Sequence, residues 1–216
     1  MDFAGAYSWS NLSFILQGFG MTLWVAAISI VFSFMLGTLL GTIRYARVPV
    51  LYHLFAVIID LLRNLPLLLT IYFIYIVLPV MGIKLPLFWA SITALSVFEG
   101  AMISEIVRGG LNSVDRGQIE AARSSGLSYM QTMRYIILPL ALRRMVPPIV
   151  SQFISLLKDT SLCVIILLPE MMHNIQIVQG HSPNYVIPSL ILAAVLYFIV
   201  NFALSIIARR LEAKTA

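Results

Sequence analysis

Charged residues are scarce in this chain of 216 residues: they make up 11% of it, while 60% of it is hydrophobic. A soluble domain usually carries about 25% charged and about 45–50% apolar residues. Too few charges remain to cover a folded core with a water-compatible surface, which indicates that a lipid bilayer is the solvent. In a soluble protein the net charge of +5 would suggest nucleic acid. Here the basic residues lie between apolar runs, so we expect no nucleic-acid partner.

Cysteine and histidine are also rare, and their positions exclude several kinds of site. The single cysteine, Cys163, lies inside an apolar run, so the chain has neither an internal disulfide nor a cysteine metal site. The three histidines have no metal-ligand spacing. The lysines, Lys84, Lys158 and Lys214, do not belong to a Gly-x-x-x-x-Gly-Lys phosphate loop. We therefore expect no metal, no other cofactor and no ATP bound by this chain itself.

What the chain does have is long apolar runs, each able to cross a bilayer, which takes about 20 helical residues. They cover residues 18–43, 50–81, 85–107, 145–168 and 185–208. No repeat or linker divides the chain. We therefore predict an all-α integral membrane protein with five transmembrane helices in a single domain, residues 1–216.

The basic residues predict the orientation of these helices. No basic residue precedes Arg44, so the first run lacks the charged segment of a cleavable signal and is expected to stay as a membrane helix. Nearly all other basic loop residues fall on one side of the predicted membrane, and only Lys84 falls on the other. The positive-inside rule then predicts an outer N-terminus and a cytoplasmic C-terminus.

The loop between the third and fourth runs, residues 113–138, is predicted to form a helix–turn–helix. Asp115 with Gln118 and Ser128 with Gln131 have the spacing of N-terminal capping boxes, and Gly126 sits where a left-handed helix cap is expected. The residues alone leave two interpretations open. The loop lies on the lipid headgroups, or its small residues let another protein dock closely.

The same loop resembles the EAA loop of importer-type ABC permeases. The matching positions are Glu120, Ala121, Ala122, Gly126, Ile136, Leu138 and Pro139. Residues 62–67, 104–110, 141–148 and 158–162 resemble motifs of the polar amino acid permeases, and the resemblance extends over about residues 18–210. One departure is Asn64-Leu65, where many relatives have smaller residues before the proline, and this leaves the substrate open.

The resemblance implies a type I ABC importer permease fold and a bacterial plasma (inner) membrane location. It implies a transport subunit rather than an enzyme, which moves a polar amino acid, with glutamine or glutamate favoured. The partners it implies are a separate ATP-binding cassette ATPase, a second permease chain, an extracytoplasmic amino-acid-binding protein and membrane lipid. Glu120, Ala121, Ala122 and Gly126 would contact the ATPase.

Charges inside a membrane cost about 2.5–3.5 kcal/mol each on insertion scales, so they usually face a bundle interior, water or a ligand. Lys158 and Asp159 are neighbours, about 100° apart around a helix, and make a poor pair with each other. Asp159 could accept the ammonium group of an amino acid, and Lys158 could approach its carboxylate. Stapling of helices explains these charges equally well. We interpret Asp159 and Thr160 as lining the substrate path.

Further charges lie in the second and third runs. Asp60 and Arg63 are three residues apart and are expected to pair across one helix face, beside a kink at Pro66. Glu99 has no basic residue one turn away, so a bond to a neighbouring helix and a substrate contact both stay open. Arg63 and Glu99 are thus further candidates for the substrate path. Glu105 and Arg108 are expected to form a structural pair.

Irregular or bent backbone is also expected at Gly109-Gly110 and at Pro147-Pro148, and in a transporter such positions can line a cavity or serve as hinges.

Three other functions compete with the importer subunit. A stand-alone secondary transporter or channel is disfavoured by the absence of an internal repeat and by the capped docking loop. An intramembrane enzyme would need a nucleophile with a base, and no histidine lies near Ser151, Ser155, Thr160 or Ser161 in the sequence. A membrane scaffold would not need unpaired charges at membrane depth.

Overall fold

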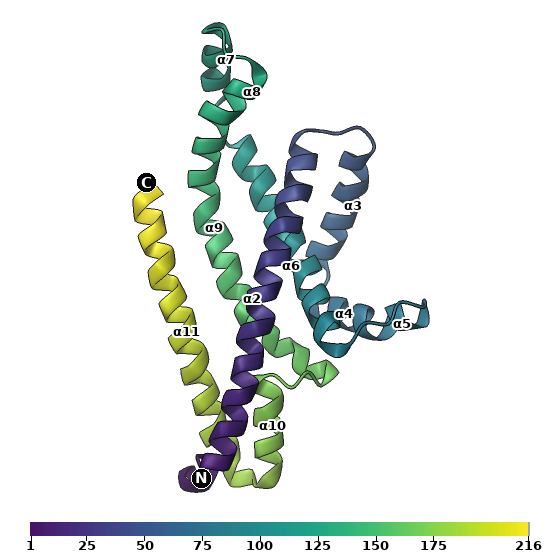
Figure 1. Cartoon of the computed structure of the whole chain (residues 1–216), viewed down its shortest axis with the longest axis vertical. Helices are drawn as coiled ribbons and strands as arrows, with labels where there is room; N and C mark the ends of the chain where they lie inside the picture. The colour runs from purple at the N-terminus through teal and green to yellow at the C-terminus, as the bar shows by residue number, and fades with distance from the viewer. Residues whose placement is uncertain (216) are drawn as a thin grey trace.

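The computed structural model describes the backbone of residues 1–215 and the side chains of residues 1–210. Within that part of the chain, all regular elements are helices. Figure 1 shows long helices running between two ends of the molecule. The N-terminus and α10 lie at one end, which we call the N-terminal end, and α7 and α8 lie at the other, which we call the loop end.

The order of the elements follows the predicted runs. In chain order they are α1 (Phe3–Ala6), α2 (Trp9–Tyr45), α3 (Leu51–Asn64), α4 (Leu67–Tyr72), η1 (Phe73–Val77), α5 (Leu78–Val80), α6 (Leu87–Asn112), α7 (Arg116–Ser124), α8 (Tyr129–Thr132), η2 (Met133–Ile137), α9 (Leu138–Asp159), η3 (Thr160–Ile166), α10 (Met171–His181), η4 (Pro183–Tyr185) and α11 (Val186–Thr215). Four helical stretches are each long and apolar enough to span a membrane: Trp9–Tyr45, Leu87–Asn112, Tyr129–Ile166 and Pro183–Arg210. The all-α fold is confirmed, and the five predicted crossings are found when α3 and the α4–α5 segment count as one broken span.

The second run is broken rather than merely kinked. The axes of Leu51–Asn64 and Leu67–Val80 differ by 112°. Leu65 lies between them in an extended conformation (φ −94°, ψ 146°), as the residue before a proline prefers, and Pro66 cannot donate the backbone hydrogen bond that a continuous helix needs. Figure 1 shows α4 and α5 turned sideways from α3 as a result. We call the segment from α3 to α5 the arm.

The irregular backbone expected at two other positions does not occur. Gly109 and Gly110 lie inside α6, and Pro147 and Pro148 lie inside α9, and both helices are continuous there. Gly110 instead allows close packing, because a Cβ atom at this position would collide with the side chain of Met145 on α9. The prolines are tolerated because neighbouring helices and local adjustments compensate for a missing bond in a membrane helix.

The most extensive contact between two helices joins α2 and α6, and we call it the seam. Small residues on α2 make it possible. A Cβ atom on Gly37 would lie 2.6 Å from Cβ of Ile103, and one on Gly41 would lie 2.8 Å from Cβ of Val107. Small residues are the usual means by which membrane helices approach closely, since lipid offers no hydrophobic drive for association.

One helix was not predicted. Residues 170–184 read as a polar stretch, but α10 forms there and packs against α2 and α11 at the N-terminal end (Figure 1). Its inner face, with Met171, Ile175 and Val178, is buried against Ile15 of α2 and Ala193 of α11. Asn174 Nδ2 also donates to the carbonyl oxygen of Phe14 at 2.7 Å. These tertiary contacts, rather than local propensity, hold the helix.

Candidate functional site

Glu99 lies near the middle of α6 with its side chain fully buried. Gln152 of α9 donates a hydrogen bond from Nε2 to Oε2 of Glu99 at 2.6 Å. The other carboxyl oxygen, Oε1, is buried and has no hydrogen-bond partner among the described residues. This oxygen therefore lies in the interior, next to a polar contact between two helices and close to the carboxyl group of Asp159.

Asp159 lies beside this contact. It is the last residue of α9, it is half-buried, and its carboxyl group interacts electrostatically with that of Glu99. The structure thus brings together Glu99 and Asp159, which are far apart in the sequence, and adds the amide of Gln152 between their helices. Two carboxyl groups and one amide can receive an ammonium group through their oxygens. We call these three residues the carboxyl cluster.

Gln152 was not predicted as a site residue. It precedes Asp159 by seven residues, or about two helical turns, so both residues lie on one face of α9. That spacing is the signal that could have identified it. An uncharged amide in an apolar run is a weaker signal than a charged side chain, although it is also costly to bury without a partner.

The other residues predicted for the substrate path, Thr160, Lys158 and Arg63, are not part of the carboxyl cluster. Thr160 is fully buried, and its hydroxyl donates to the carbonyl oxygen of Leu157 at 2.7 Å, as hydroxyls in membrane helices commonly do. Lys158 is exposed and takes part in no ion pair within the described part of the chain. Arg63 is exposed at the end of α3, where its charge acts on Glu105.

The charges near the loop end form a different arrangement from the one predicted. Asp60 and Arg63 are both exposed, and the expected ion pair between them is wrong: the ion pairs of residues 1–210 both involve Glu105. Arg44, at the end of α2, donates from Nη1 to Oε2 of Glu105 at 2.8 Å. Arg108 binds the same carboxylate through Nε and Nη2, so the predicted Glu105–Arg108 pair is confirmed. This group of three closes the seam at the loop end.

The predicted helix–turn–helix is present and locally capped. Asp115 caps α7 by accepting from the N–H of Gly117 at 2.7 Å, although the expected reciprocal bond with Gln118 is absent among the hydrogen bonds of this loop. Ser128 and Gln131 form the complete capping box of α8, with bonds of 3.3 and 2.8 Å. Gly126 has φ +86°, the left-handed conformation predicted for it. The loop is thus held by its own caps.

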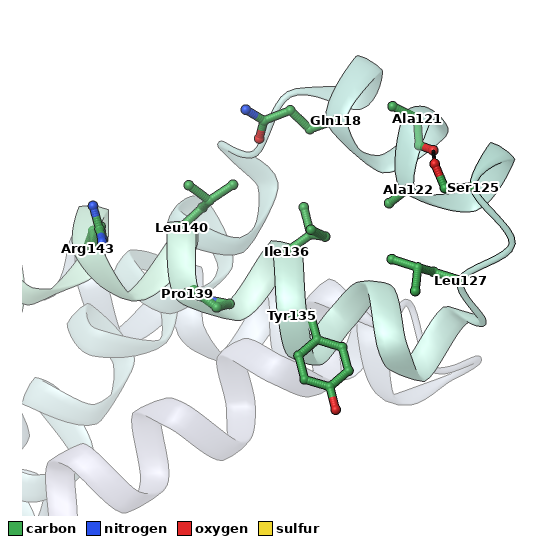
Figure 2. Close-up of a pocket in the computed structure, with 10 residues that line it drawn as sticks. All are labelled: Gln118, Ala121, Ala122, Ser125, Leu127, Tyr135, Ile136, Pro139, Leu140 and Arg143. Carbon is green, nitrogen blue, oxygen red and sulfur yellow. Dashed lines mark hydrogen bonds between the residues drawn. The ribbon is translucent and has the colours of Figure 1, made fainter.

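The four loop residues singled out earlier lie on and beside α7. Glu120 and Ala121 are exposed, Ala122 is buried, and Gly126 is exposed in open space. Figure 2 shows a groove between α7 and the helix formed by η2 and α9. Its volume is about 630 Å³, and the short side chains of Ala121 and Ala122 form part of its α7 wall. The loop therefore presents a charged side chain, a small-residue surface and a groove to whatever lies beyond the loop end.

No cluster of histidine, cysteine, aspartate or glutamate side chains that could hold a metal occurs in the region that the structure describes.

Residues 33–216 match the protein family described as "binding-protein-dependent transport system inner membrane component". The chain belongs to this family. It is 61% identical over 216 residues to a probable glutamine ABC transporter permease protein, GlnP, of Bacillus subtilis, covering 99% of both chains. It is 36% identical over 215 residues to the glutamine transport system permease protein GlnP of Escherichia coli K12, covering 98% of this chain and 97% of that one.

Solved structures show the same fold. The chain superposes with a TM-score of 0.91 on a chain of an amino acid ABC transporter crystallised with histidines, at 28% identity and with 99% of both chains covered. An inward-facing structure of the MetNI methionine ABC transporter matches with a TM-score of 0.72 at 23% identity, covering 94% of this chain and 99% of that one. The type I importer permease fold and the family resemblance read from the loop are thereby confirmed, and this permease is a transport component rather than an enzyme.

Proposed function

We propose that this permease carries a polar amino acid, with glutamine favoured, across the bacterial plasma membrane into the cytoplasm. The observation that supports glutamine as the substrate is the 61% identity, over 99% of both chains, to a protein named as a probable glutamine permease. The more distant relative of Escherichia coli is also named for glutamine. Both relatives align end to end with this chain, so the residues of the carboxyl cluster fall within the aligned length.

The carboxyl cluster is the proposed substrate path. A free amino acid carries an ammonium group, and the unpartnered Oε1 of Glu99 together with the carboxyl group of Asp159 would accept it. Gln152 fixes one oxygen of Glu99 and leaves the other for the ligand. Lys158 and Arg63, both exposed, would approach the substrate carboxylate from this chain or across a second permease chain, and Thr160 shapes the path beside Asp159.

The loop is the proposed contact with a separate ATPase subunit. Glu120, Ala121, Ala122 and Gly126 would dock on that subunit, and α9 would transmit its movement. The helix begins at Leu138, directly after the loop, and ends at Asp159 in the carboxyl cluster. It is continuous over 22 residues, or about 33 Å, so a displacement at the ATPase contact would reach the substrate path through one rigid element.

The remaining partners follow from the surfaces. The loop end, rich in arginine, is assigned to the cytoplasm, and the N-terminal end is assigned to the outside, where an amino-acid-binding protein would deliver the substrate. Large apolar side chains are exposed along α2, α11 and the arm, and these surfaces would meet lipid and a second permease chain. The domain organisation stays as predicted, a single unit of residues 1–216.

The first test is co-purification of the tagged chain from membranes, followed by glutamine uptake. An ATPase subunit is expected with the wild type and is expected to be lost in the Glu120→Lys/Gly126→Asp variant, because these changes reverse the charge and fill the open position at the contact. The Asp159→Asn variant should keep the ATPase and lose uptake. Full uptake by Asp159→Asn would remove this residue from the path.

One alternative is kept, a stand-alone secondary transporter or channel. Uptake by the isolated chain in vesicles without ATP, and a stable chain with no ATPase under any condition, would replace the proposal by this alternative.

A further inference from the structure

Glu170 is a fully buried carboxyl group at the N-terminal end of the molecule. It lies outside the long membrane-spanning stretches, between η3 and α10, and is the N-cap residue of α10. The chain reaches it directly from Asp159 and Thr160 through η3, with Leu167 in the left-handed conformation (φ +64°) at the end of that helix. Glu170 thus marks the far end of the segment that begins in the proposed substrate path.

The carboxyl group of Glu170 connects α10 to α2. Oε1 accepts from the backbone N–H of His173 at 2.8 Å, and Oε2 accepts from that of Met172 at 2.9 Å. The hydroxyl of Thr22 on α2 lies 3.5 Å from Oε2 and accepts from the N–H of Met171 at 3.2 Å. Gly18 lets α2 come this close, since a Cβ there would lie 2.9 Å from the carbonyl oxygen of Glu170.

No cation balances the charge of this carboxylate. Among the described residues, no lysine, arginine or histidine forms an ion pair with it. The titratable groups that face it are Tyr197 from α11 and Cys163 from η3. Its own helix α10 presents the backbone N–H of His173, and α2 presents only the uncharged Thr22. Burial without a counter-charge raises the pKa of Glu170 from 4.5 to about 7, although the N–H donors of Met172 and His173 and the Thr22 hydroxyl each lower it.

We propose that Glu170 is a proton-responsive positioning residue for transport: its neutral form holds η3 and α10 against α2, and its ionisation favours opening of this junction toward the outside. The claim about transport rests on the proposed function, because that function places Asp159 and Thr160 in the substrate path. The claim about the junction rests only on the burial and contacts of Glu170.

The direction follows from linkage between protonation and opening. In the closed junction the carboxyl group binds its proton more tightly than in an opened junction, where water would restore the ordinary pKa. The closed form is therefore most favoured at pH values below the ordinary value of 4.5, and it loses this advantage as pH rises to about 7. Across that window the ratio of open to closed junction rises by up to about tenfold per pH unit, and above it the ratio levels off.

The test is hydrogen exchange of α10 in the full-length chain in lipid nanodiscs, corrected for intrinsic exchange rates, from about pH 5 to about pH 8. In the wild type, opening of residues 171–176 should rise by at least about tenfold between the two ends of this range. Glu170→Gln keeps the shape and the neutral charge, so its α10 should stay protected at every pH. Asp2→Asn is the matched control, because Asp2 is an exposed capping carboxylate at the same end, and it should behave as the wild type.

Opening that does not change with pH in the wild type, or a pH dependence that survives Glu170→Gln, would overturn the proposal. Thr22→Val provides a second variant in case Glu170→Gln does not fold. It removes a hydroxyl that lowers the pKa of Glu170 in the closed junction, so the rise in opening should continue to higher pH before it levels off; a rise that levels off at the same pH as in the wild type counts against the assignment to Glu170.

Glutamine uptake is measured on the same variants in cells. Uptake that rises with external pH in the wild type and is flat in Glu170→Gln supports the positioning role. A pH-dependent junction with identical uptake profiles in both would overturn that role and leave the proposed function intact. Absence of glutamine uptake at any pH in the wild type would count against the proposed function, while the exchange data would still decide whether Glu170 controls the junction.

Discussion

The seam between α2 and α6 and the arm from α3 to α5 differ in how far their side chains are buried and paired. In the seam, small residues are buried, and Arg44 and Arg108 both form ion pairs with Glu105. In the arm, Asp60 and Arg63 are exposed without an ion pair among the described residues, and large apolar side chains such as Val57 and Val80 are exposed beside them. The charges of the seam thus have partners within one chain, whereas the arm leaves charged and apolar side chains exposed to surroundings that one chain does not supply.

Substitution of the glycines of α2 should give the largest loss of stability, and it tests whether the seam depends on close packing. Gly37→Ala/Gly41→Ala places methyl groups against Ile103 and Val107, and we expect a loss of more than about 3 kcal/mol in unfolding free energy, because overpacking at backbone contact distance cannot relax easily. Gly20→Ala on the same helix is the matched control. It meets no atom within 4 Å and should stabilise the chain by up to about 1 kcal/mol through helix propensity.

The measurement is unfolding of the solubilised full-length chain by titration with denaturing detergent. Opposite signs for the two variants are expected. Equal effects would mean that α2 does not depend on close approach to α6, and the seam would lose its special status.

The buried charges give the next largest effect. Glu105→Gln leaves Arg44, which is only 7% exposed, without its carboxylate. Breaking a buried pair costs about 3–5 kcal/mol, and the partial exposure of Glu105 reduces the expected loss to about 2 kcal/mol. Asp60→Asn is the matched change in the arm, and it should alter unfolding free energy by less than about 0.5 kcal/mol, since Asp60 is exposed.

Both variants can be measured in the same detergent titration. A loss at Asp60→Asn as large as that at Glu105→Gln would show that Asp60 is bound within the single chain and would erase the contrast between the seam and the arm.

Local signals explain which parts of this fold the sequence could predict. Long apolar runs predicted the spans, and the loop was predicted in detail because its caps join residues a few positions apart, as Ser128 and Gln131 do. The charge pair of Glu105 and Arg108 was also local. Asp60 and Arg63 have the same spacing but stay apart, because exposed pairs of this kind are worth only about 0.2–0.5 kcal/mol and do not order two long side chains.

The rest depends on contacts between distant segments. The Gln152–Glu99 bond joins two helices 53 residues apart, and Arg44 reaches Glu105 across 61 residues. The helix α10 forms because Glu170 caps it and α2 and α11 cover it, so no short window of sequence carries its signal. The missed partners of Glu99 and Glu105 are chosen by the fold, whereas the confirmed cap of α8 and the Glu105–Arg108 pair are fixed by neighbours in the chain.

Substitution of Pro66 is expected to change stability little, and it gives the sharpest test of what shapes the arm. Two causes could hold the 112° bend: the local restriction that Pro66 places on Leu65, and the burial of one face of the α4–η1 segment. Leu67, Ile71 and Ile74 on that face are 6%, 0% and 6% exposed and belong to the core formed with α6 and η3. This burial is worth roughly 1.5–3 kcal/mol per side chain, more than the local preference of one residue, so tertiary contact should hold the bend by itself.

We therefore expect Pro66→Ala to keep the bend and to change unfolding free energy by less than about 1 kcal/mol. Spin labels at exposed positions Ile76 on η1 and Val31 on α2 report the angle through their distance distribution. An unchanged distribution means that α6 holds the arm in place. A new, longer distance means that the proline alone sets the bend, and α4 would then be free to join α3 into one straight helix, in which case the arm would differ from the other spans only by a single residue.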